Sequence, residues 1–156
     1  MGTRHKQTVI AKDGTIKVAQ YGQWDGYPTG QGCDILEFLR NADLNKYQSE
    51  LEKLREITEE EGEKIDKEDG ENWDKKYPYL SRDCGAKIHK LIEHGKVLFV
   101  SLIDEKEARK WCEGFYTIDF KNNTFTTEFG NKTTEYSLDK LPGYECYFKD
   151  TNVEED

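Results

Sequence analysis

The hydrophobic and polar positions near the start of the chain alternate as they do in β-strands. Residues 8–11 and 15–21 are rich in Thr, Val, Ile and Tyr, and Asp13-Gly14 lies between them. Asp-Gly at the centre supplies the positive φ that a two-residue type I′ turn requires. The pattern therefore predicts a β-hairpin, which leads into residues 19–32, AQYGQWDGYPTGQG.

A helical period follows the hairpin. Residues 33–40 carry apolar positions three and four apart, and a second apolar stripe with Glu and Lys between its members runs through 44–58. Residues 86–94 show the same period, and Gly95 is a typical residue to end a helix. These three segments are predicted to be helices.

The last third of the chain returns mainly to strand patterns. Residues 96–103 are short and apolar, as in a central strand, whereas the charged residues 104–112 favour a helical turn. Residues 114–120 and 124–129 alternate and predict a second hairpin, and 133–138 can add a further strand.

This order of elements indicates the α+β class. Two antiparallel hairpins with helices grouped between them fit α+β better than an alternating β-α-β order. We expect a single domain with one antiparallel sheet, made of two hairpins plus a central strand, and two or three helices packed on one face. The 156 residues suffice for one domain with its own core. Residues 1–149 are assigned to this domain.

Composition changes the picture in one segment. Residues 59–74, EEEGEKIDKEDGENWD, contain nine acids, two lysines and two glycines. Such a stretch is typical of a solvated linker, and we predict an acidic mobile insertion over 59–76. Its carboxylates do not have the spacing of an EF-hand loop. Residues 150–156 are also acidic and are expected to form a frayed tail.

Charge and cysteine usage narrow the function classes. The formal net charge of −9 argues against binding to nucleic-acid backbones, which requires Lys and Arg at the phosphates. It leaves open a small anionic ligand in a local basic pocket, or an acidic surface that binds a basic protein. The four cysteines have no C-x-x-C spacing, and no apolar run or leader indicates a membrane span or secretion. We expect a cytoplasmic protein with free thiols, no metal and no cofactor.

Candidate chemistry gathers in the stretch 19–32. Gly30 and Gly32 precede a predicted helix, where backbone N–H groups favour an anion, and Thr29 can add a hydroxyl or cap the helix. A single G-x-G is a weak signal, because no third Gly or Lys-Ser/Thr completes a phosphate-binding motif. The glycines can equally serve a difficult corner between a strand and a helix.

Aromatic and charged residues surround these glycines. The rings of Tyr21, Trp24 and Tyr27 can stack on a base, or they can plug the core beneath the corner. Asp25 is the only charge in the stretch, and its burial decides whether it has a role. Two further candidates, Arg4 and His5, lie at the start of the chain, and a third, Arg82, lies before the third predicted helix. The predicted ligand-binding residues are therefore Arg4, His5, Tyr21, Trp24, Asp25, Tyr27, Thr29, Gly30, Gly32 and Arg82.

Several motifs resemble a family of small uncharacterised proteins of tailed phages and bacteria. The resemblance rests on Gly2-Thr-Arg-His5, on Gln23-Trp-Asp-Gly-Tyr-Pro-Thr-Gly-Gln-Gly32, on Ser81-Arg-Asp-Cys-Gly85 and on Cys112–Asp119. It covers the first forty residues well and the last eighty loosely, and it carries over no catalytic residue. It implies a phage accessory protein inside a bacterial cell, where such proteins often counter host defences.

Three functions follow, in this order of preference. The first is a module that binds a small anionic, nucleotide-type ligand around residues 19–32. Arg4 is expected close by, because it lies almost at the first strand and the second strand returns alongside the first. The second is an inhibitor that binds a host protein through its acidic surface. The third is a small hydrolase or phosphodiesterase that uses Asp25, Arg4 and His5. A homodimer is expected, because a strand edge and the amphipathic helix at 44–58 both favour partners.

Overall fold

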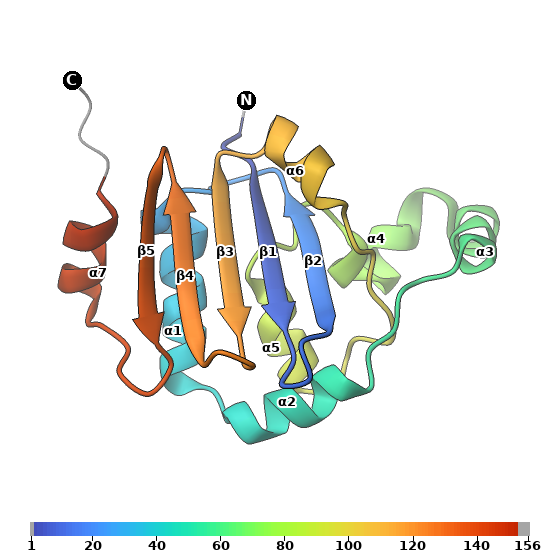
Figure 1. The fold of residues 1–156 in the computed structure, drawn as a ribbon. Helices are drawn as coiled ribbons and strands as arrows, with labels where there is room; N and C mark the ends of the chain where they lie inside the picture. Colours follow the sequence, from blue (N-terminus) through green and yellow to red (C-terminus); the bar gives the residue numbers. More distant parts are fainter. Residues whose placement is uncertain (1, 153–156) are drawn as a thin grey trace.

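A mixed five-stranded sheet forms the centre of the molecule (Figure 1). The computed structural model describes residues 2–152, and its strands follow the order β2-β1-β3-β4-β5. The strands are β1 (His5–Ile10), β2 (Ile16–Gly22), β3 (Gly114–Asp119), β4 (Thr124–Phe129) and β5 (Lys132–Ser137). β1 runs parallel to β3, whereas the other neighbouring pairs are antiparallel. The α+β class is confirmed, but the sheet is mixed rather than antiparallel. After the helices the chain returns to the sheet as β3, which pairs in parallel with β1 rather than with β2.

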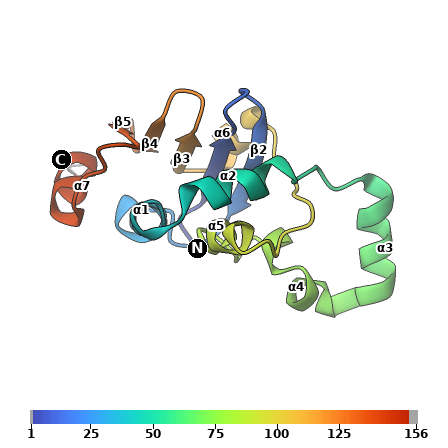
Figure 2. The same cartoon turned by 90° about the horizontal axis from the view of Figure 1, so that it is seen from below.

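Seven α-helices belong to the described part of the chain, more than the two or three expected. They are α1 (Cys33–Asn41), α2 (Leu44–Glu52), α3 (Glu59–Asp69), α4 (Trp73–Lys76), α5 (Lys87–Glu93), α6 (Glu105–Trp111) and α7 (Tyr144–Thr151). Figure 2 shows α1, α2 and α5 together on one side of the sheet, while α3 and α4 lie farther out. The single helix predicted over 44–58 is shorter in the structure: α2 ends at Glu52, and Thr58 is the N-cap residue of α3.

Alternate residues of the strands face α1, α2 and α5. Val18 of β2, Val9 of β1 and Ile118 of β3 form a row across the sheet, and at most 1% of each residue is exposed. The same face of β1 also carries His5 and Gln7, each 1% exposed. The core is therefore apolar at one end of β1 and polar at the other.

A buried hydrogen-bonded chain crosses this polar part of the core. Nε2 of His89 on α5 lies 2.5 Å from Oε1 of Gln7, and its Nδ1 lies 2.7 Å from the hydroxyl of Tyr47 on α2. Burial lowers the pKa of His89 to about 3, so the ring is neutral. The chain ties the sheet to two helices.

The first hairpin is confirmed, but its turn differs from the expected one. The N–H of Ala11 donates to the carbonyl of Thr15 at 2.8 Å, so three residues form the loop. Only Gly14 among them has a positive φ, +88°, whereas a type I′ turn needs two such residues. A register shift at Val9 and Ile10 accompanies the extra residue.

Residues 96–103 do not form the central strand that their apolar character predicted. They run as an extended strap that makes an isolated bridge at Val100 with Glu56, and the N–H of Ile103 donates to the carbonyl of Ala19. Phe99 and Val100 bury their side chains against the core. The strap therefore follows the edge of β2, and β3 occupies the middle of the sheet.

The acidic segment 59–76 folds into α3, a short 3₁₀ turn at Gly70–Asn72, and α4. Thr58 and Glu61 form a reciprocal capping box that starts α3, which explains why a helix forms in so charged a sequence. Ile65 is 8% exposed, and Trp73 packs against the core cluster. We call residues 59–76 the acidic arm; its mobility stays a prediction.

The described end of the chain also differs from the expectation. α7 includes residues 150 and 151, which were assigned to a frayed tail, and the hydroxyl of Tyr136 donates to Asp150 at 3.0 Å. Tyr147 of the same helix is fully buried, and its hydroxyl lies 2.9 Å from that of Thr127. Residue 152 follows the helix, and the remaining residues of the predicted tail, 153–156, lie outside the described residues.

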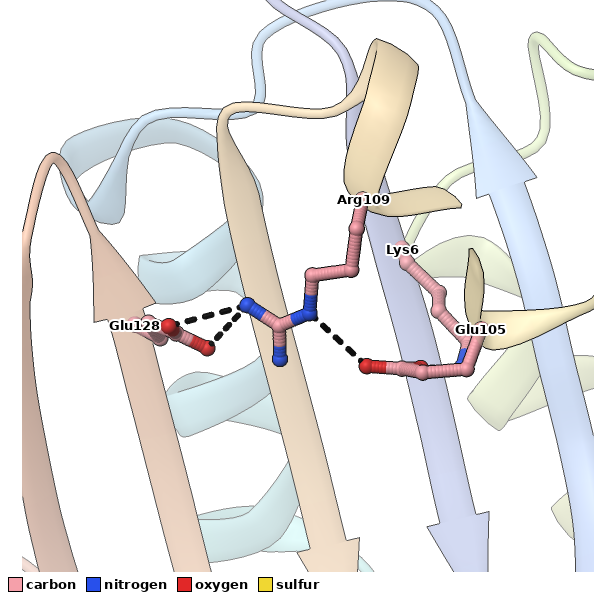
Figure 3. Close-up of polar contacts among 4 residues, drawn as sticks. All are labelled: Lys6, Glu105, Arg109 and Glu128. Atoms are coloured by element: carbon pink, nitrogen blue, oxygen red, sulfur yellow. Dashed lines mark hydrogen bonds and ion pairs between the residues drawn. The ribbon is translucent and has the colours of Figure 1, made fainter. Parts of the chain in front are cut away.

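The opposite face of the sheet carries α6, which corrects the prediction that helices pack on one face only. Figure 3 shows Arg109 of α6 between Glu105 and Glu128, with both Glu128 oxygens 2.8–2.9 Å from one guanidinium nitrogen. The guanidinium also lies 3.8 Å from the ring centroid of Phe115 on β3. Lys6 of β1, 4% exposed, pairs with Glu105. These ionic contacts hold α6 on the sheet.

Candidate functional site

The 19–32 loop is a rigid corner between β2 and α1. The N–H of Gly26 donates to the carbonyl of Thr3 at 2.9 Å, and the N–H of Gln23 donates to the carbonyl of Arg82 at 3.1 Å. The side chain of Gln31 accepts from the N–H of Ala86 at 2.8 Å. The loop is thus bound to the start of β1 and to the segment before α5.

The backbone donors predicted for an anion are used inside the loop. The N–H groups of Gly30 and Gly32 donate to the carbonyl of Tyr27, and that of Gln31 donates to the carbonyl of Asp25. A side chain at Gly30 would collide with Asp25, and one at Gly32 would collide with Tyr116 and Tyr147. Both glycines therefore serve close packing, and the expectation that they offer free donors is wrong.

The three rings of the loop line three different cavities. Tyr21 lines a cavity of about 360 Å³ together with Arg82. Tyr27 and Thr29 line one of about 220 Å³ near α7. Trp24 and Asp25 line the largest of the three, about 690 Å³. The predicted cluster of three stacking rings does not form.

Arg4 and His5 also lie away from the exposed part of the loop. The guanidinium of Arg4 lies 5.8 Å from the ring centroid of Trp111, next to α6. The ring of His5 is buried against Gly22, and no hydrogen-bond partner for either ring nitrogen lies within residues 2–152. Asp25 is exposed. Arg4, His5 and Asp25 thus occupy three separate surroundings rather than one hydrolytic site.

The largest of these three cavities is an open cleft between the loop, α1 and α5, which we call the Trp24 cleft. It is lined by Trp24, Asp25, Gln31, Asp34, Glu37, Phe38, Asn41, Ala42, Asp83, Cys84, Ala86, Lys87, Lys90 and Glu93. Most binding cavities combine flat apolar groups with a few polar side chains, and this cleft has both. Only two of its residues were predicted from the sequence.

Trp24 forms a fixed flat wall of the cleft. Its Nε1–H donates to Oδ1 of Asp83 at 2.6 Å, and 49% of the residue is exposed. A Cβ at Gly2 would collide with the ring, so the start of the chain lies directly against it. Beside it, Asp25 has a φ of +62°, a left-handed conformation that is uncommon outside glycine. The ring is therefore positioned before any ligand binds.

The helices place acidic side chains of α1 opposite basic side chains of α5, and α5 also contributes Glu93, whose carboxylate accepts from the N–H of Asp43. Asp34 and Glu37 are three residues apart on α1, and Lys87 and Lys90 are three apart on α5. Within the described chain, none of these four side chains forms an ion pair. Partial burial raises the pKa of Asp34, with the carboxylates of Asp25 and Glu37 adding to the increase and Lys87 opposing it. Carboxylates that repel one another here are stabilised by a hydrogen-bond donor or a cation.

These wall residues escaped the sequence analysis because each is a common charge on a helix surface. The signal that could have found them is spacing, since residues three apart share one helix face. Spacing alone does not tell that the two faces meet. The structure shows that the two faces meet, because α1 packs beside α5. Phe38 of α1 and Ala86, just before α5, line the cleft between them.

Other site types have little support in the described residues. Across residues 2–152, no group of three or more His, Cys, Asp or Glu side chains is arranged to hold a metal ion. None of the helices found there has the length and apolar character needed to cross a membrane. The cysteines at 33, 84, 112 and 146 are all free thiols. No protein-family model matches the chain, and comparison with curated proteins and with solved structures finds no significant similarity.

Proposed function

We propose that the protein binds a small nucleotide-type ligand in the Trp24 cleft. The main observation in support of this function is that oppositely charged side chains of α1 and α5, which form no ion pairs within the described residues, line a common cleft. The indole ring of Trp24, held by Asp83, forms another wall of the same cleft. A nucleotide has the matching parts: a flat base, amino and hydroxyl donors, and an anionic phosphate. Stacking of a base on an aromatic side chain contributes about 1–3 kcal/mol.

The two walls suggest how such a ligand lies. The base stacks on Trp24, its exocyclic donors face Asp34 and Glu37, and the phosphate lies between Lys87 and Lys90. The cleft contains five carboxylates and two ammonium groups. This negative balance disfavours di- and triphosphates, because each added phosphate charge meets more carboxylates than lysines. We therefore propose a ligand with a single phosphate.

Binding is proposed rather than turnover. The residues expected to form a hydrolytic site, Arg4, His5 and Asp25, have different surroundings, as described above. The resemblance to phage proteins adds a biological context, in which the protein holds a nucleotide signal in the bacterial cytoplasm. That context rests on the sequence motifs.

Calorimetric titration of the full chain tests the proposal. We expect AMP or GMP to bind more tightly than the nucleoside, and ATP to bind more weakly than the monophosphate. Trp24→Ala and the double substitution Lys87→Gln/Lys90→Gln should each weaken binding at least tenfold. The matched control is Lys64→Gln/Lys67→Gln, which removes two exposed lysines three apart on α3. Binding that is equal in all four proteins would refute the proposal.

The acidic arm supports a second candidate function, binding of a basic host protein. Both Figures 1 and 2 show α3 set apart from the sheet, where its carboxylates can approach a partner. Arg55 holds Glu61 through two 2.6 Å hydrogen bonds, so the start of the arm is ordered. Replacing four exposed acids (Glu59, Glu63, Asp66 and Glu68) by Gln should abolish activity in infected cells and leave the melting temperature unchanged. Full activity of that variant would remove this candidate.

A further inference from the structure

A second cavity lies along the outer edge of β2 and shares no residue with the Trp24 cleft. Its volume is about 360 Å³. It is lined by Val18, Ala19, Gln20, Tyr21, Tyr79, Leu80, Arg82, Ile88, Val100, Ser101 and Ile103. No carboxylate is among these residues, which distinguishes this cavity from the acidic Trp24 cleft.

The floor of this cavity is apolar and belongs to the core. Val18, Ile88 and Val100 line it although at most 3% of each residue is exposed. Tyr79, 5% exposed, closes one side. A ligand body that fills this space removes apolar surface from water at about 25 cal/mol per Å². The deep part of the cavity therefore favours a hydrocarbon group.

The rim offers a backbone donor. The carbonyl of Ala19 points away from β1 and accepts from the N–H of Ile103 at 2.8 Å. Tyr21 is two residues further along the same edge strand, so its N–H points to the same side. Within residues 2–152 this N–H has no hydrogen-bond acceptor. The strap covers Ala19 and ends before it can cover Tyr21.

The rim also offers a cation. The carbonyl of Arg82 accepts from the N–H of Gln23 at 3.1 Å, which fixes the Arg82 backbone just beyond the end of β2. Its side chain is exposed and makes no hydrogen bond or ion pair with any residue in 2–152. Tyr21 and Arg82 line the same cavity. A guanidinium and a backbone N–H that both reach one carboxylate can each donate to its oxygens. Ser101, also exposed on the rim, adds a hydroxyl.

We propose that this cavity binds a carboxylic acid with an apolar body, such as a medium-chain fatty acid. The carboxylate lies between the Tyr21 N–H and the Arg82 guanidinium, and the hydrocarbon chain covers Val18, Ile88 and Val100. One cation with one backbone donor suits a single negative charge. This site is independent of the Trp24 cleft, and its existence does not depend on the proposed nucleotide binding.

Titration of the full-length protein with octanoate and with uncharged octanamide tests this assignment. We expect octanoate to bind at least tenfold more tightly than octanamide, because only the carboxylate engages Arg82. Arg82→Gln should weaken octanoate binding at least tenfold and leave octanamide binding within twofold. Ser101→Phe, which places a ring at the mouth, should weaken both. Arg82 and Ser101 are exposed, so neither substitution disturbs the core.

Two control variants separate this site from the nucleotide site. Lys90→Gln removes a cation of the Trp24 cleft, and Trp24→Ala removes its ring, so both should bind octanoate like the unchanged protein. Arg82→Gln should likewise retain nucleotide binding. Equal affinities for octanoate and octanamide, octanoate binding that is insensitive to Arg82→Gln, or no octanoate binding at millimolar concentration would each overturn the assignment.

Discussion

The indole Nε1–H of Trp24 donates a 2.6 Å hydrogen bond to Oδ1 of Asp83, joining the 19–32 loop to the segment before α5. The N–H of Asp83 in turn donates to the hydroxyl of Ser81 at 3.1 Å. A half-exposed aromatic ring that is anchored at its edge loses little conformational entropy when a ligand stacks on its face. The bond therefore makes Trp24 a preorganised surface of the cleft.

Asp83→Ala should release this ring. We expect binding of a nucleoside monophosphate to weaken roughly three- to tenfold, because an unanchored side chain costs about 0.5–1.5 kcal/mol to immobilise. Fluorescence anisotropy measures the ring directly in a Trp73→Phe/Trp111→Phe background, where Trp24 is the sole indole. Anisotropy should fall in Asp83→Ala and stay unchanged in Asp74→Ala, an exposed acid on α4. An unchanged anisotropy in Asp83→Ala would show that packing alone holds the ring.

Gly22→Ala should destabilise the fold severely. A Cβ at this position would collide with the imidazole of His5, which is buried and cannot move into solvent. Overpacking of this kind costs about 1–3 kcal/mol or more, measured as a lower midpoint in urea unfolding. Gly62→Ala is the matched control: nothing lies near its Cβ position in α3, so it should raise stability by about 0.5–1 kcal/mol. Equal effects at the two positions would contradict the assigned packing of His5.

Local signals explain which elements the sequence could predict. Asp13-Gly14 marked the first hairpin because a turn is decided by neighbouring residues, and Gly95 ends α5 with a φ of +70° as expected. The parallel pairing of β1 with β3 has no local signature, because it depends on where the chain returns after the helices. α7 was missed because its buried residues, Tyr147 and Thr151, do not form an apolar stripe in the sequence.

The candidate site was predictable only in part, for a related reason. Trp24 and Asp25 stood out because large rings and a lone charge are unusual in a glycine-rich loop. Lys87 and Asp34 resemble ordinary solvated positions on their own helices, and only the packing of α1 beside α5 brings them to one cleft. Arg4 was expected there because it directly precedes β1, but its side chain extends toward Trp111 of α6.

Glu105→Ala should destabilise the protein more than an ordinary surface substitution. It leaves the ammonium of Lys6, which is 4% exposed, without its carboxylate, and a buried unpaired charge is costly. We expect a loss of about 2 kcal/mol in urea unfolding, moderated because Glu105 itself is half exposed. Glu107→Ala on the same helix removes only the exposed pair with Lys110 and should cost less than about 0.5 kcal/mol.

A double-mutant cycle separates the charge from the packing of the same side chain. Lys6→Met keeps an apolar stem of similar length and removes the charge that needs Glu105. In that background Glu105→Ala should have little further effect, because no buried ammonium is left unpaired. If Glu105→Ala costs as much in the Lys6→Met background as in the unchanged protein, the loss comes from the contact with Arg109 instead.

Stability should fall as the pH is lowered from about 6.5 toward 4. Burial lowers the pKa of His5 to about 4 and that of His89 to about 3, so the folded protein keeps both rings neutral where the unfolded chain binds protons. The contribution of the two neutral histidines to stability is thus complete above the pKa of histidine in the unfolded chain, about 6.5. It is lost as the pH falls from that value toward the lower pKa values of the folded protein. Each ring contributes a slope of up to about 1.4 kcal/mol per pH unit.

The slope, rather than the stability itself, identifies the residues responsible. His5→Gln should reduce the steepness of the unfolding free energy between pH 6 and pH 4.5, whatever its effect at pH 7, because one proton fewer is taken up on unfolding. His94→Gln is the control, since that ring is about half exposed and pairs only loosely with Glu93 at 3.8 Å. Urea unfolding at four pH values gives both slopes. A His5→Gln slope equal to that of the unchanged protein would mean that His5 is protonated while buried, and that the polar end of the core beneath β1 takes up a proton without unfolding.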